Sequence, residues 1–553
     1  MALKTVIIGG VAGGASTAAR LRRLDEKVEI IIIEGGEYIS YANCGLPYYI
    51  GGTIKVRDNL LVMSPQRFKE WFNIEVRVNN EALSIDRAKK EIIIMNQSTG
   101  VKYNESYDYL VLSPGAEPLR PPLPGIDSPG IFSLRTIPDT DRIYNYIQEY
   151  TPQKAVVVGA GYIGLEMAEN LQHRGLEVTV VELAPQVLPP IDAEMAALVQ
   201  QYLRSRGINL RLGDGVRQFH HDKNSGLKVE LAGGELLEAD LVLLSIGVKP
   251  ETKLAREAGL EVERGIKVND YMQTSDSSIY ALGDAVEVTN LVTGKPAVIP
   301  LAGPANKQGR IVANNISGRR ERYKGTQGTS VLKIFDMTVA TTGANERVLK
   351  DAGIQYHIVI IHPNDFAGYY PGASPLSLKL LFSPEGKILG SQAVGFSGVE
   401  KRIDVIAAAL RSGNTVYDLQ ALELAYAPPY SSAKDPVNIA GYVATNILQG
   451  DYKTIEVTEL IDMEDPGPFQ ILDVREPEEN ELGKIPGSKN IPLGKLRERL
   501  NELDPQKEVI TYCSIGLRSY LAMRILTLNG FNKVRNLSGG YRLYQALQNE
   551  RNS

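Results

Sequence analysis

The sequence has few cysteines, a single tryptophan and no long apolar run. Its two cysteines, Cys44 and Cys513, stand far apart in 553 residues, which excludes a fold built on disulfides and suits a reducing compartment. No apolar run approaches the roughly 18 residues that a membrane span needs. The first apolar run is short and ends in glycines, whereas a signal peptide has a longer apolar region. We therefore expect a cytoplasmic protein that does not enter a membrane.

An excess of positive charge is also absent. Lys and Arg number 60 against 65 Asp and Glu, and the formal net charge is −5. This balance argues against nucleic acid or an anionic membrane surface as a partner. The 43% hydrophobic and 23% charged residues fit an α/β protein, and the length predicts three or four domains. We expect no bound metal.

Two stretches repeat the order strand, glycine-rich turn, helix, strand. In the second, KAVVVGAGYIGLEMAENLQHRG, the residues Gly159, Gly161 and Gly164 complete a G-x-G-x-x-G turn, and Glu182 ends the next strand. Such a turn brings backbone and a helix N-terminus to a pyrophosphate, and the carboxylate binds a ribose 2′-hydroxyl. Because the carboxylate would also repel a 2′-phosphate, the sequence predicts NADH rather than NADPH.

The first stretch, KTVIIGGVAGGASTAARLRRL, departs from that pattern. Gly9 and Gly14 are the outer glycines, but Val11 takes the middle position. Glu34 at the end of the next strand and the later Gly-Asp pair at Asp284 support a second nucleotide site. Two dinucleotide folds, the second inserted within the first, predict a flavin and a nicotinamide. Two purely structural Rossmann-like domains are the alternative.

The chain resembles the flavoprotein disulfide reductases in the order and spacing of these turns and of the strand ends SPGA, SIGVKP and ALGDA. The resemblance extends over residues 1 to about 450. The resemblance implies FAD in the first fold, NADH in the inserted fold, and a C-terminal α/β domain that forms a homodimer. We expect an FAD-binding domain at 1–150 and 253–325, an NADH-binding domain at 151–252, a dimerisation domain at 326–450 and a linker at 451–461.

Cys44 lies in SYANCGLPYYI, where most members of that superfamily carry a second cysteine at the position held here by Tyr49. Without that partner, Cys44 cycles through a mixed disulfide, a persulfide or a sulfenic acid. The segment closely resembles coenzyme A-disulfide reductases and NADH-dependent persulfide reductases, in which the matching cysteine forms a disulfide with coenzyme A (CoA). An inert buried thiol is the alternative.

The resemblance also implies roles for further residues. Ser40 and Asn43 match positions near the flavin, and Arg20 and Arg23 match positions near bound nucleotide or substrate. Tyrosines of the partner subunit donate hydrogen bonds to the reacting sulfur in the family. The remaining matches are Tyr426, one of Tyr369 and Tyr370 with Tyr369 favoured, Lys434 near substrate, and Asn306, where some relatives have a histidine. Read without the family, Tyr-Pro clusters more often indicate loop packing.

The tail, about residues 462–550, resembles a single rhodanese domain, which completes the expected α/β fold class over 462–553. Cys513 opens a loop that runs to Arg518 between a strand and a helix. Backbone N–H groups and a helix N-terminus aimed at the sulfur favour a thiolate and stabilise a bound persulfide, and Arg518 adds a cation. Asp473 and Arg475 are expected to form a structural ion pair.

These features predict an NADH- and FAD-dependent reductase of CoA persulfide, polysulfide or CoA disulfide, fused to a sulfurtransferase. We hypothesise that the flexible arm of CoA carries sulfane sulfur from Cys513 to Cys44. One alternative is an NADH oxidase or peroxidase that cycles Cys44 through sulfenic acid. Those relatives usually carry a histidine near the first glycine turn, and the five histidines here lie elsewhere. A non-catalytic, sulfur-sensing flavoprotein is the other alternative.

Overall fold

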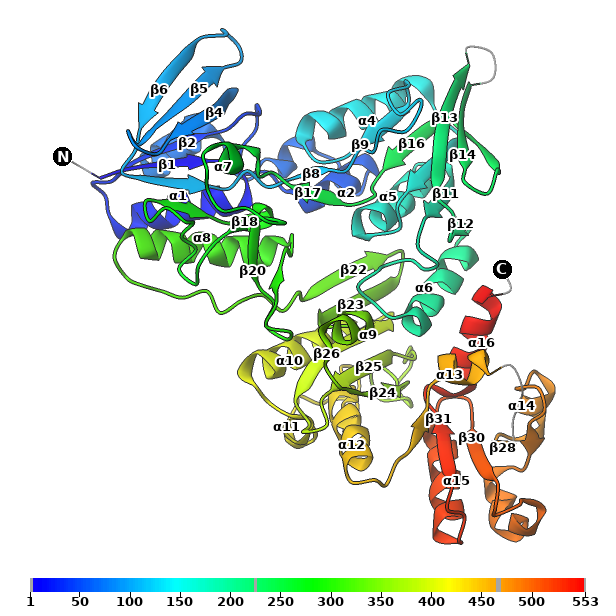
Figure 1. Ribbon diagram of the computed structural model, residues 1–553. Coiled ribbons are helices and arrows are strands. Elements are labelled where there is room, and N and C mark those ends of the chain that lie inside the picture. The colour runs from blue at the N-terminus through cyan, green and yellow to red at the C-terminus, as the bar shows by residue number, and fades with distance from the viewer. Residues whose placement is uncertain (1–2, 223–225, 464–468, 552–553) are drawn as a thin grey trace. The chain divides into compact units, whose positions relative to one another are not determined.

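The computed structural model describes residues 3–222, 226–463 and 469–551 (Figure 1). The chain forms two compact units. Unit 1 comprises Met1–Pro185 and Asn209–Thr326, and unit 2 comprises Gln186–Ile208 and Gln327–Ser553.

The first sheet of unit 1 has five strands in the order β19-β7-β1-β2-β3, all parallel. The chain runs from β1 (Lys4–Ile8) through α1 (Ala12–Leu24) to β2 (Glu29–Ile33), as the apolar runs and the glycine turn predict. β19 (Ile279–Ala281) returns to this sheet after the whole of the second fold. The predicted insertion of one fold within the other is therefore confirmed. Helices α1 and α8 (Ala302–Ile316) lie together beside this sheet (Figure 1).

The second sheet of unit 1 has the order β12-β11-β10-β16-β9 and is also parallel. Its glycine turn joins β10 (Lys154–Val158) to α5 (Tyr162–His173), which leads to β11 (Glu177–Glu182). In such sheets ligands bind outside the carboxyl ends of the strands, and both glycine turns lie at those ends.

The remaining helices and strands of unit 1 either belong to these two sheets or cover and connect them. They are η1 (Asn43–Gly45), α2 (Leu46–Ile50), η2 (Arg57–Leu60), α3 (Pro65–Phe72), β3 (Glu75–Arg77), β4 (Asn80–Asp86), β5 (Glu91–Asn96), β6 (Lys102–Ser106), β7 (Tyr109–Leu112), β8 (Ala116–Pro118), β9 (Ile131–Ser133), α4 (Ile137–Tyr150), β12 (Asn209–Leu212), β13 (Val216–Asp222), β14 (Gly226–Leu231), β15 (Leu236–Ala239), β16 (Leu241–Leu244), β17 (Val248–Pro250), α7 (Lys253–Glu257), β18 (Ile266–Lys267), η3 (Gly283–Ala285), β20 (Val286–Thr289) and β21 (Pro296–Ala297).

Unit 2 contains an antiparallel sheet of order β22-β23-β26-β25-β24. Every residue of β25 and β26 is buried, and the polar side chains among them, such as Lys379 and Gln392, are bonded inside unit 2. The elements are α6 (Ala193–Ser205), β22 (Ser330–Ile334), β23 (Met337–Gly343), α9 (Glu346–Ala352), β24 (His357–Ile361), β25 (Ser377–Phe382), β26 (Ile388–Gly395), α10 (Val399–Ser412), α11 (Val416–Ala421) and α12 (Pro436–Leu448).

A buried ion cluster ties α6 and α9 to this sheet. The ammonium of Lys379 on β25 is fully buried and bonds Asp192 at 2.8 Å, Glu346 at 2.6 Å and Glu194. The three carboxylates lie close enough together to surround a cation, and the Lys379 ammonium supplies one. Burial alone would lower the pKa of Lys379, but the carboxylates outweigh burial and raise it.

The C-terminal sheet of unit 2 is parallel, in the order β27-β31-β30-β28-β29. Strand β27 (Thr454–Ile455) pairs with β31 at its edge, so the segment expected to be a linker contributes to this sheet. The other elements are α13 (Val457–Asp462), β28 (Phe469–Asp473), α14 (Pro477–Glu481), β29 (Lys489–Asn490), η4 (Leu493–Glu498), η5 (Leu500–Glu502), β30 (Glu508–Tyr512), α15 (Leu517–Leu528), β31 (Val534–Leu537) and α16 (Gly540–Arg551).

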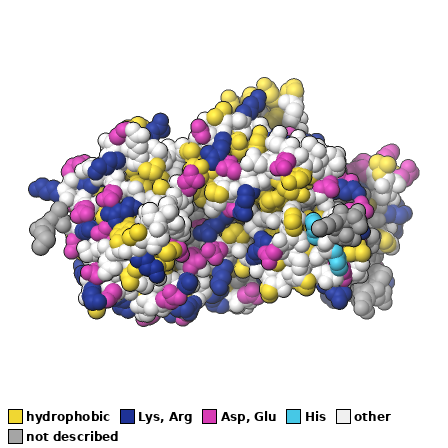
Figure 2. All heavy atoms as spheres, turned by 90° about the horizontal axis from the view of Figure 1, so that it is seen from above, with side chains coloured by type: hydrophobic (Ala, Val, Ile, Leu, Met, Phe, Trp, Pro, Cys, Tyr) yellow, Lys and Arg dark blue, Asp and Glu magenta, His cyan; other side chains and the backbone are white. Residues whose placement is uncertain are grey.

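Acidic and basic side chains are interspersed over the face drawn in Figure 2, in keeping with the near balance of charge in the sequence. Among the described residues, no helix combines the length and the apolar character needed to cross a bilayer.

Candidate active sites

The second glycine turn has the backbone geometry of a dinucleotide site. Gly159 has φ +103°, and a Cβ there would lie 2.4 Å from the Ser245 carbonyl oxygen. A Cβ on Gly164 would lie 1.9 Å from the Gly159 carbonyl oxygen, so this glycine lets helix and strand approach closely. Gly161 faces open space, which leaves its backbone accessible to a pyrophosphate. The structure thus fits the three roles predicted for these glycines.

The first turn repeats this geometry with one substitution. Gly9 has φ +96° and a Cβ there would meet the Ser113 carbonyl oxygen at 2.0 Å, while Gly14 packs on the Gly9 carbonyl. Val11 takes the N-cap position of α1, so the middle residue tolerates a side chain while both outer positions require glycine. This turn therefore also fits a dinucleotide.

The two acidic residues at the strand ends occupy equivalent places. Glu34 accepts the N–H of Gly10 at 2.9 Å, and Glu182 accepts the N–H of Ala160 at 2.7 Å. Each carboxylate is thereby fixed beside its glycine turn, where a ribose hydroxyl is recognised. Asp284, in η3, lies in the same unit, and desolvation raises the pKa of its carboxyl group.

The Cys44 segment is tied directly to the first glycine turn. Ser40 has a left-handed backbone with φ +44°, and its N–H donates to the Gly10 carbonyl at 2.9 Å. Such strain in a non-glycine residue is a feature of functional segments. Cys44 then follows in η1, before α2, and is exposed. This exposure contradicts the alternative of an inert buried thiol, and Asn43 beside it is exposed as well.

Cys44 is a free cysteine, and Tyr49 at the expected second-cysteine position is buried against Tyr144 with ring centroids 5.0 Å apart. Although Cys44 is exposed, surrounding protein desolvates its sulfur and raises the pKa of the thiol, and the charges of Glu166 and Asp284 raise it further. Unit 1 by itself therefore does not stabilise a Cys44 thiolate.

Glu166 is a residue near Cys44 that the sequence reasoning missed. It lies on α5, and the Tyr48 hydroxyl donates to it at 3.4 Å. Desolvation, together with the charge of Glu169, raises the pKa of Glu166 to about 7, so its carboxyl group holds a proton over part of the neutral range. Glu166 stands just after Gly164, on the helix that begins at the second glycine turn. That position is the signal in the sequence by which it could have been found.

Arginines gather where α1 lies beside α8. The positive charges of Arg310, Arg319 and Arg23 lie close enough to Arg20 to lower its pKa, after desolvation as the largest cause. The structure thus brings Arg20 and Arg23 together and adds two arginines that the sequence reasoning missed. Asn306 lies on α8, where it accepts the Ser16 hydroxyl at 2.5 Å.

In unit 2 the two tyrosine segments meet. The hydroxyls of Tyr369 and Tyr426 lie 3.1 Å apart, and the two rings are 75% and 49% exposed. Tyr370 instead packs edge-on against Phe366, so Tyr369 is the one of the two that meets Tyr426. Lys434, in the second segment, is exposed.

A buried arginine holds these segments in place. Arg402 on α10 donates to the Asp365 carbonyl at 2.7 Å and to Ser431 and Asp435 at 3.1 Å. The Ala367 N–H donates to the Pro428 carbonyl and links the segments directly. Sequence reasoning missed Arg402, because its role depends on tertiary contacts.

The Cys513 loop follows β30 in the C-terminal sheet. The Gly516 N–H donates to the Cys513 sulfur at 3.1 Å, and the Ser519 hydroxyl lies 3.4 Å from it. Gly516 is the N-cap of α15, so a backbone donor and a helix N-terminus face the sulfur as predicted. Arg518 pairs with Glu479 at 2.6 Å on one side of this loop.

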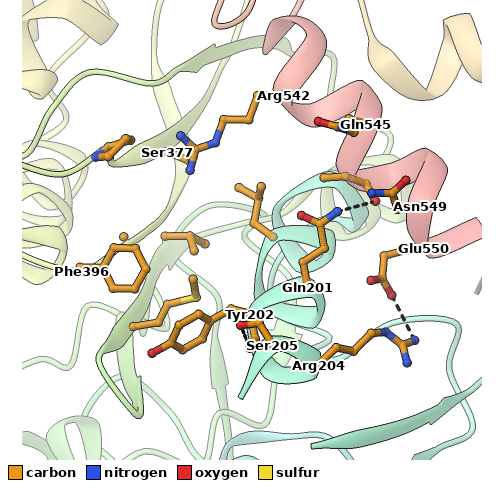
Figure 3. Close-up of a pocket in the computed structure, with 16 residues that line it drawn as sticks. Gln201, Tyr202, Arg204, Ser205, Ser377, Phe396, Arg542, Gln545, Asn549 and Glu550 are labelled. Atoms are coloured by element: carbon orange, nitrogen blue, oxygen red, sulfur yellow. Dashed lines mark hydrogen bonds and ion pairs between the residues drawn. The ribbon is translucent and has the colours of Figure 1, made fainter. Parts of the chain in front are cut away.

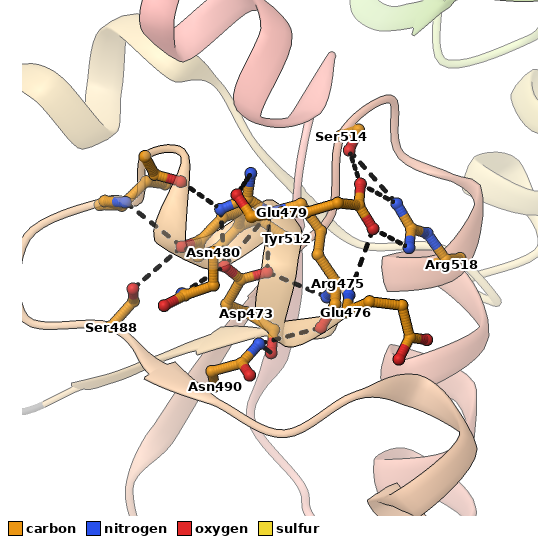
Figure 4. A network of polar contacts seen from close by, with 12 residues as sticks. Asp473, Arg475, Glu476, Glu479, Asn480, Ser488, Asn490, Tyr512, Ser514 and Arg518 are labelled. Atoms are coloured by element: carbon orange, nitrogen blue, oxygen red, sulfur yellow. Dashed lines mark hydrogen bonds and ion pairs between the residues drawn. The ribbon is translucent and has the colours of Figure 1, made fainter.

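A network of hydrogen bonds and ion pairs lies beside the Cys513 loop (Figure 4). Arg475 and Asp473 are both buried and form an ion pair of 2.7 Å, which confirms the expected structural role. Tyr512, just before Cys513, donates to Asp473 at 2.9 Å. On the side of the loop, Ser514 donates to Glu479 at 2.7 Å.

Comparison with known proteins agrees with this geometry. Residues 3–309 match the pyridine nucleotide-disulphide oxidoreductases. The chain belongs to this family. Residues 329–436 match the dimerisation domain of these oxidoreductases, and residues 456–547 match a rhodanese-like domain. The expected α/β class, with Rossmann-like domains followed by dimerisation and rhodanese domains, is confirmed.

Two curated relatives cover the oxidoreductase part. A coenzyme A disulfide reductase of Staphylococcus haemolyticus is 37% identical over 448 residues, which are 80% of this chain and 100% of the relative. An NADH oxidase of Methanocaldococcus jannaschii is 36% identical over 441 residues, 79% of this chain and 98% of the relative.

Two solved structures cover almost the whole chain. Reduced CoADR-RHD of Bacillus anthracis is 50% identical with a TM-score of 0.97, covering 100% of this chain and 99% of that one. An NAD-dependent persulfide reductase from A. fulgidus is 40% identical with a TM-score of 0.92, covering 98% and 100%. This oxidoreductase uses FAD and NAD(H).

Nicotinamide preference is predicted to depend on Glu182. We expect a lower KM for NADH than for NADPH, and Glu182→Ala should reduce the ratio of the two KM values about tenfold, because it removes a ribose acceptor and a charge that repels phosphate. Steady-state kinetics with both cofactors measures this ratio. Glu177→Ala, at the exposed start of the same strand, is the matched control and should leave it unchanged. Equal kcat/KM for both cofactors in the wild type would contradict the prediction.

Proposed function

We propose that this oxidoreductase reduces CoA persulfides, polysulfides or CoA disulfide with NADH, and that its rhodanese domain handles sulfane sulfur. The observation that carries the proposal is Cys44 itself. It is exposed and joined to the first glycine turn, and Tyr49 stands where a second thiol would be needed. The names of the relatives that act on CoA disulfide and on persulfides support the same chemistry.

The proposed reaction uses Cys44 as a nucleophile. Its thiolate attacks a CoA persulfide at the sulfur attached to CoA, so a Cys44–CoA disulfide forms and the terminal sulfur leaves as hydrosulfide. With CoA disulfide as substrate, the leaving group is instead CoA thiolate. FAD and NADH, when bound, would supply the two electrons that cleave the mixed disulfide. Cys44 thiolate and CoA thiolate are then regenerated.

The surrounding residues would stabilise the charges of the Cys44 thiolate and of the substrate. Because unit 1 raises the pKa of Cys44, the proposal assigns stabilisation of its thiolate to hydroxyl donors from the partner's tyrosine pair. The arginines around Arg20 offer guanidinium groups to the phosphates of CoA. FAD would be held by the turn at Gly9 and Gly14 with Glu34 and Asp284. NADH would be held by the turn at Gly159, Gly161 and Gly164.

Substrate-resolved kinetics tests the proposal. NADH consumption would be followed with CoA disulfide, CoA persulfide, polysulfide and dioxygen, while free CoA and sulfide are quantified. The proposal requires turnover with a sulfur substrate and release of thiol or sulfide in proportion to NADH consumed. Turnover with dioxygen or peroxide alone would instead favour the NADH oxidase or peroxidase alternative.

We infer a homodimer in which each subunit's tyrosine pair serves the partner's Cys44. Tyr426→Phe is predicted to lower kcat about tenfold or more without loss of FAD, because it removes one hydroxyl that donates toward the reacting sulfur. Steady-state kinetics and flavin absorbance measure both effects. Tyr417→Phe, at an exposed position on α11 of the same domain, should leave kcat unchanged. A catalytically active monomer by light scattering would contradict the inference.

A further inference from the structure

Unit 2 contains a cavity of about 670 Å³ that belongs to none of the sites described above. It lies among α6, the β23–β26 strands and α16, and Figure 3 shows the side chains that line it. Its size is within the range of small-molecule sites. Neither cysteine lines it, nor does any residue of the tyrosine pair.

One guanidinium in this cavity, that of Arg542, has no carboxylate partner among the residues that the structure describes. Within the described C-terminal domain, every arginine except Arg497 and Arg542 pairs with a carboxylate. The paired arginines are Arg475, Arg499, Arg518, Arg524, Arg535 and Arg551. Arg497 is exposed to solvent, whereas Arg542 is half-buried, and desolvation lowers the pKa of its guanidinium. A cation held out of water without a partner is unfavourable.

Among the described residues, the side chains near Arg542 in this cavity offer it no free carboxylate. Ser377, toward which its side chain points in Figure 3, is already bonded to His362 at 2.8 Å. Burial and the charge of Arg542 lower the pKa of His362 to about 3, so this imidazole is neutral. The carboxylate that lines the cavity, Glu550, pairs with Arg204 at 3.3 Å instead.

The rest of the lining suits an apolar body with a polar edge. Leu198, Met337, Val394 and Phe396 supply apolar surface, and Phe396 is 43% exposed. Polar side chains come from Gln201 on α6 and from Gln545 and Asn549 on α16 (Figure 3). An organic molecule with one anionic group would pair with Arg542 and cover this apolar surface.

We propose that this cavity binds a small organic anion, a carboxylate, sulfonate or phosphate attached to an apolar group, with Arg542 as its counterion. A charge-assisted pair with a guanidinium fixes the anionic group, and the apolar side chains of the lining favour a ligand with an apolar body over an inorganic anion. The site goes beyond the proposed reductase function. It also adjoins the Cys513 loop, because the Arg542 backbone N–H donates to the Ser514 carbonyl at 3.1 Å.

Calorimetric titration of the full-length, FAD-loaded enzyme with naphthalene sulfonate tests the site, with NAD⁺ and CoA saturating so that their sites are filled. One-site binding is expected, and neutral naphthalene sulfonamide should bind at least about tenfold more weakly because it cannot form the ion pair. Arg542→Gln should weaken sulfonate binding at least about tenfold and abolish the difference between the two probes. Arg497→Gln, the matched exposed arginine, should bind as the wild type does.

A second variant keeps the test independent of any folding defect at Arg542. Phe396→Ala removes apolar surface and should weaken both probes by a similar factor, so the preference for sulfonate over sulfonamide is retained. The proposal is overturned if the sulfonate does not bind to the wild type, or if Arg542→Gln binds it as tightly. Equal binding of sulfonate and sulfonamide by the wild type would overturn it as well.

Discussion

Cys44→Ser is expected to abolish NADH-dependent reduction of every sulfur substrate while the protein stays yellow with bound FAD. A serine hydroxyl does not form a disulfide with CoA, so the mixed disulfide on which the proposed reaction depends is lost. The loss in kcat should be at least about a thousandfold, as for removal of other essential nucleophiles. NADH consumption with each sulfur substrate measures it. Retention of substantial turnover in Cys44→Ser would contradict the proposed role.

Cys513→Ser is the matched control, and it also tests the sulfur relay. This variant should reduce small CoA substrates at the wild-type rate, because Cys44 and the cofactor turns are intact. It should slow only reactions that draw sulfur from a donor that loads the rhodanese site. The decisive measurement is sulfide release from such a donor with NADH and catalytic CoA. Equal rates in wild type and Cys513→Ser would remove Cys513 from the path and refute transfer by the CoA arm.

The parts of the fold that sequence reasoning predicts are those with local signals. Both glycine turns, with their strands and helices, follow from apolar runs and punctuating glycines. The return of β19 to the first sheet is a pairing distant in the sequence, and its signal was the Gly-Asp pair at Asp284. The Cys513 loop is predicted equally well, because a strand, a short loop and a helix there are consecutive in the chain. Residues such as Glu34 and Glu182 are found because a fixed spacing links them to the turn.

Residues that act through contacts distant in the sequence have no such signal. Arg402 supports the tyrosine segments from another helix, and a single arginine in an amphipathic helix usually indicates a solvent-facing position. Arg542 is conspicuous only once its neighbours are known to lack a free carboxylate. The segment 451–461 looks like a linker because its strand is two residues long and takes its place through pairing with β31.

The buried lysine of unit 2 is the clearest case of such a contact, and its removal should have a large effect on stability. Lys379→Met is predicted to destabilise unit 2 by about 3–5 kcal/mol, because it leaves Asp192, Glu194 and Glu346 clustered without their cation. Hydrogen–deuterium exchange of the β25 amides measures this by segment, and exchange should be faster by about 100-fold or more. Fluorescence is less suitable, because the single tryptophan, Trp71, lies in unit 1.

Lys350→Met is the control, because Lys350 pairs with the same Glu346 at 3.2 Å but is 66% exposed in its side chain. Its effect should stay within about 0.5 kcal/mol. Unchanged protection of β25 in Lys379→Met would contradict the prediction.

The pH dependence of the two proteins separates charge from lost packing. In the wild type, burial would raise the pKa of Glu346, but Lys379 outweighs burial and holds it at about 2. A depressed carboxyl pKa stabilises the fold above the unfolded value of 4.5 and loses that contribution as the pH falls toward 2. In Lys379→Met the carboxylates lack this cation, so their pKa values rise and they bind protons. The penalty of the substitution should therefore be smaller near pH 4 than at pH 8. A penalty independent of pH would mean that packing of the lysine chain, and not its charge, holds α6 and α9 on the sheet.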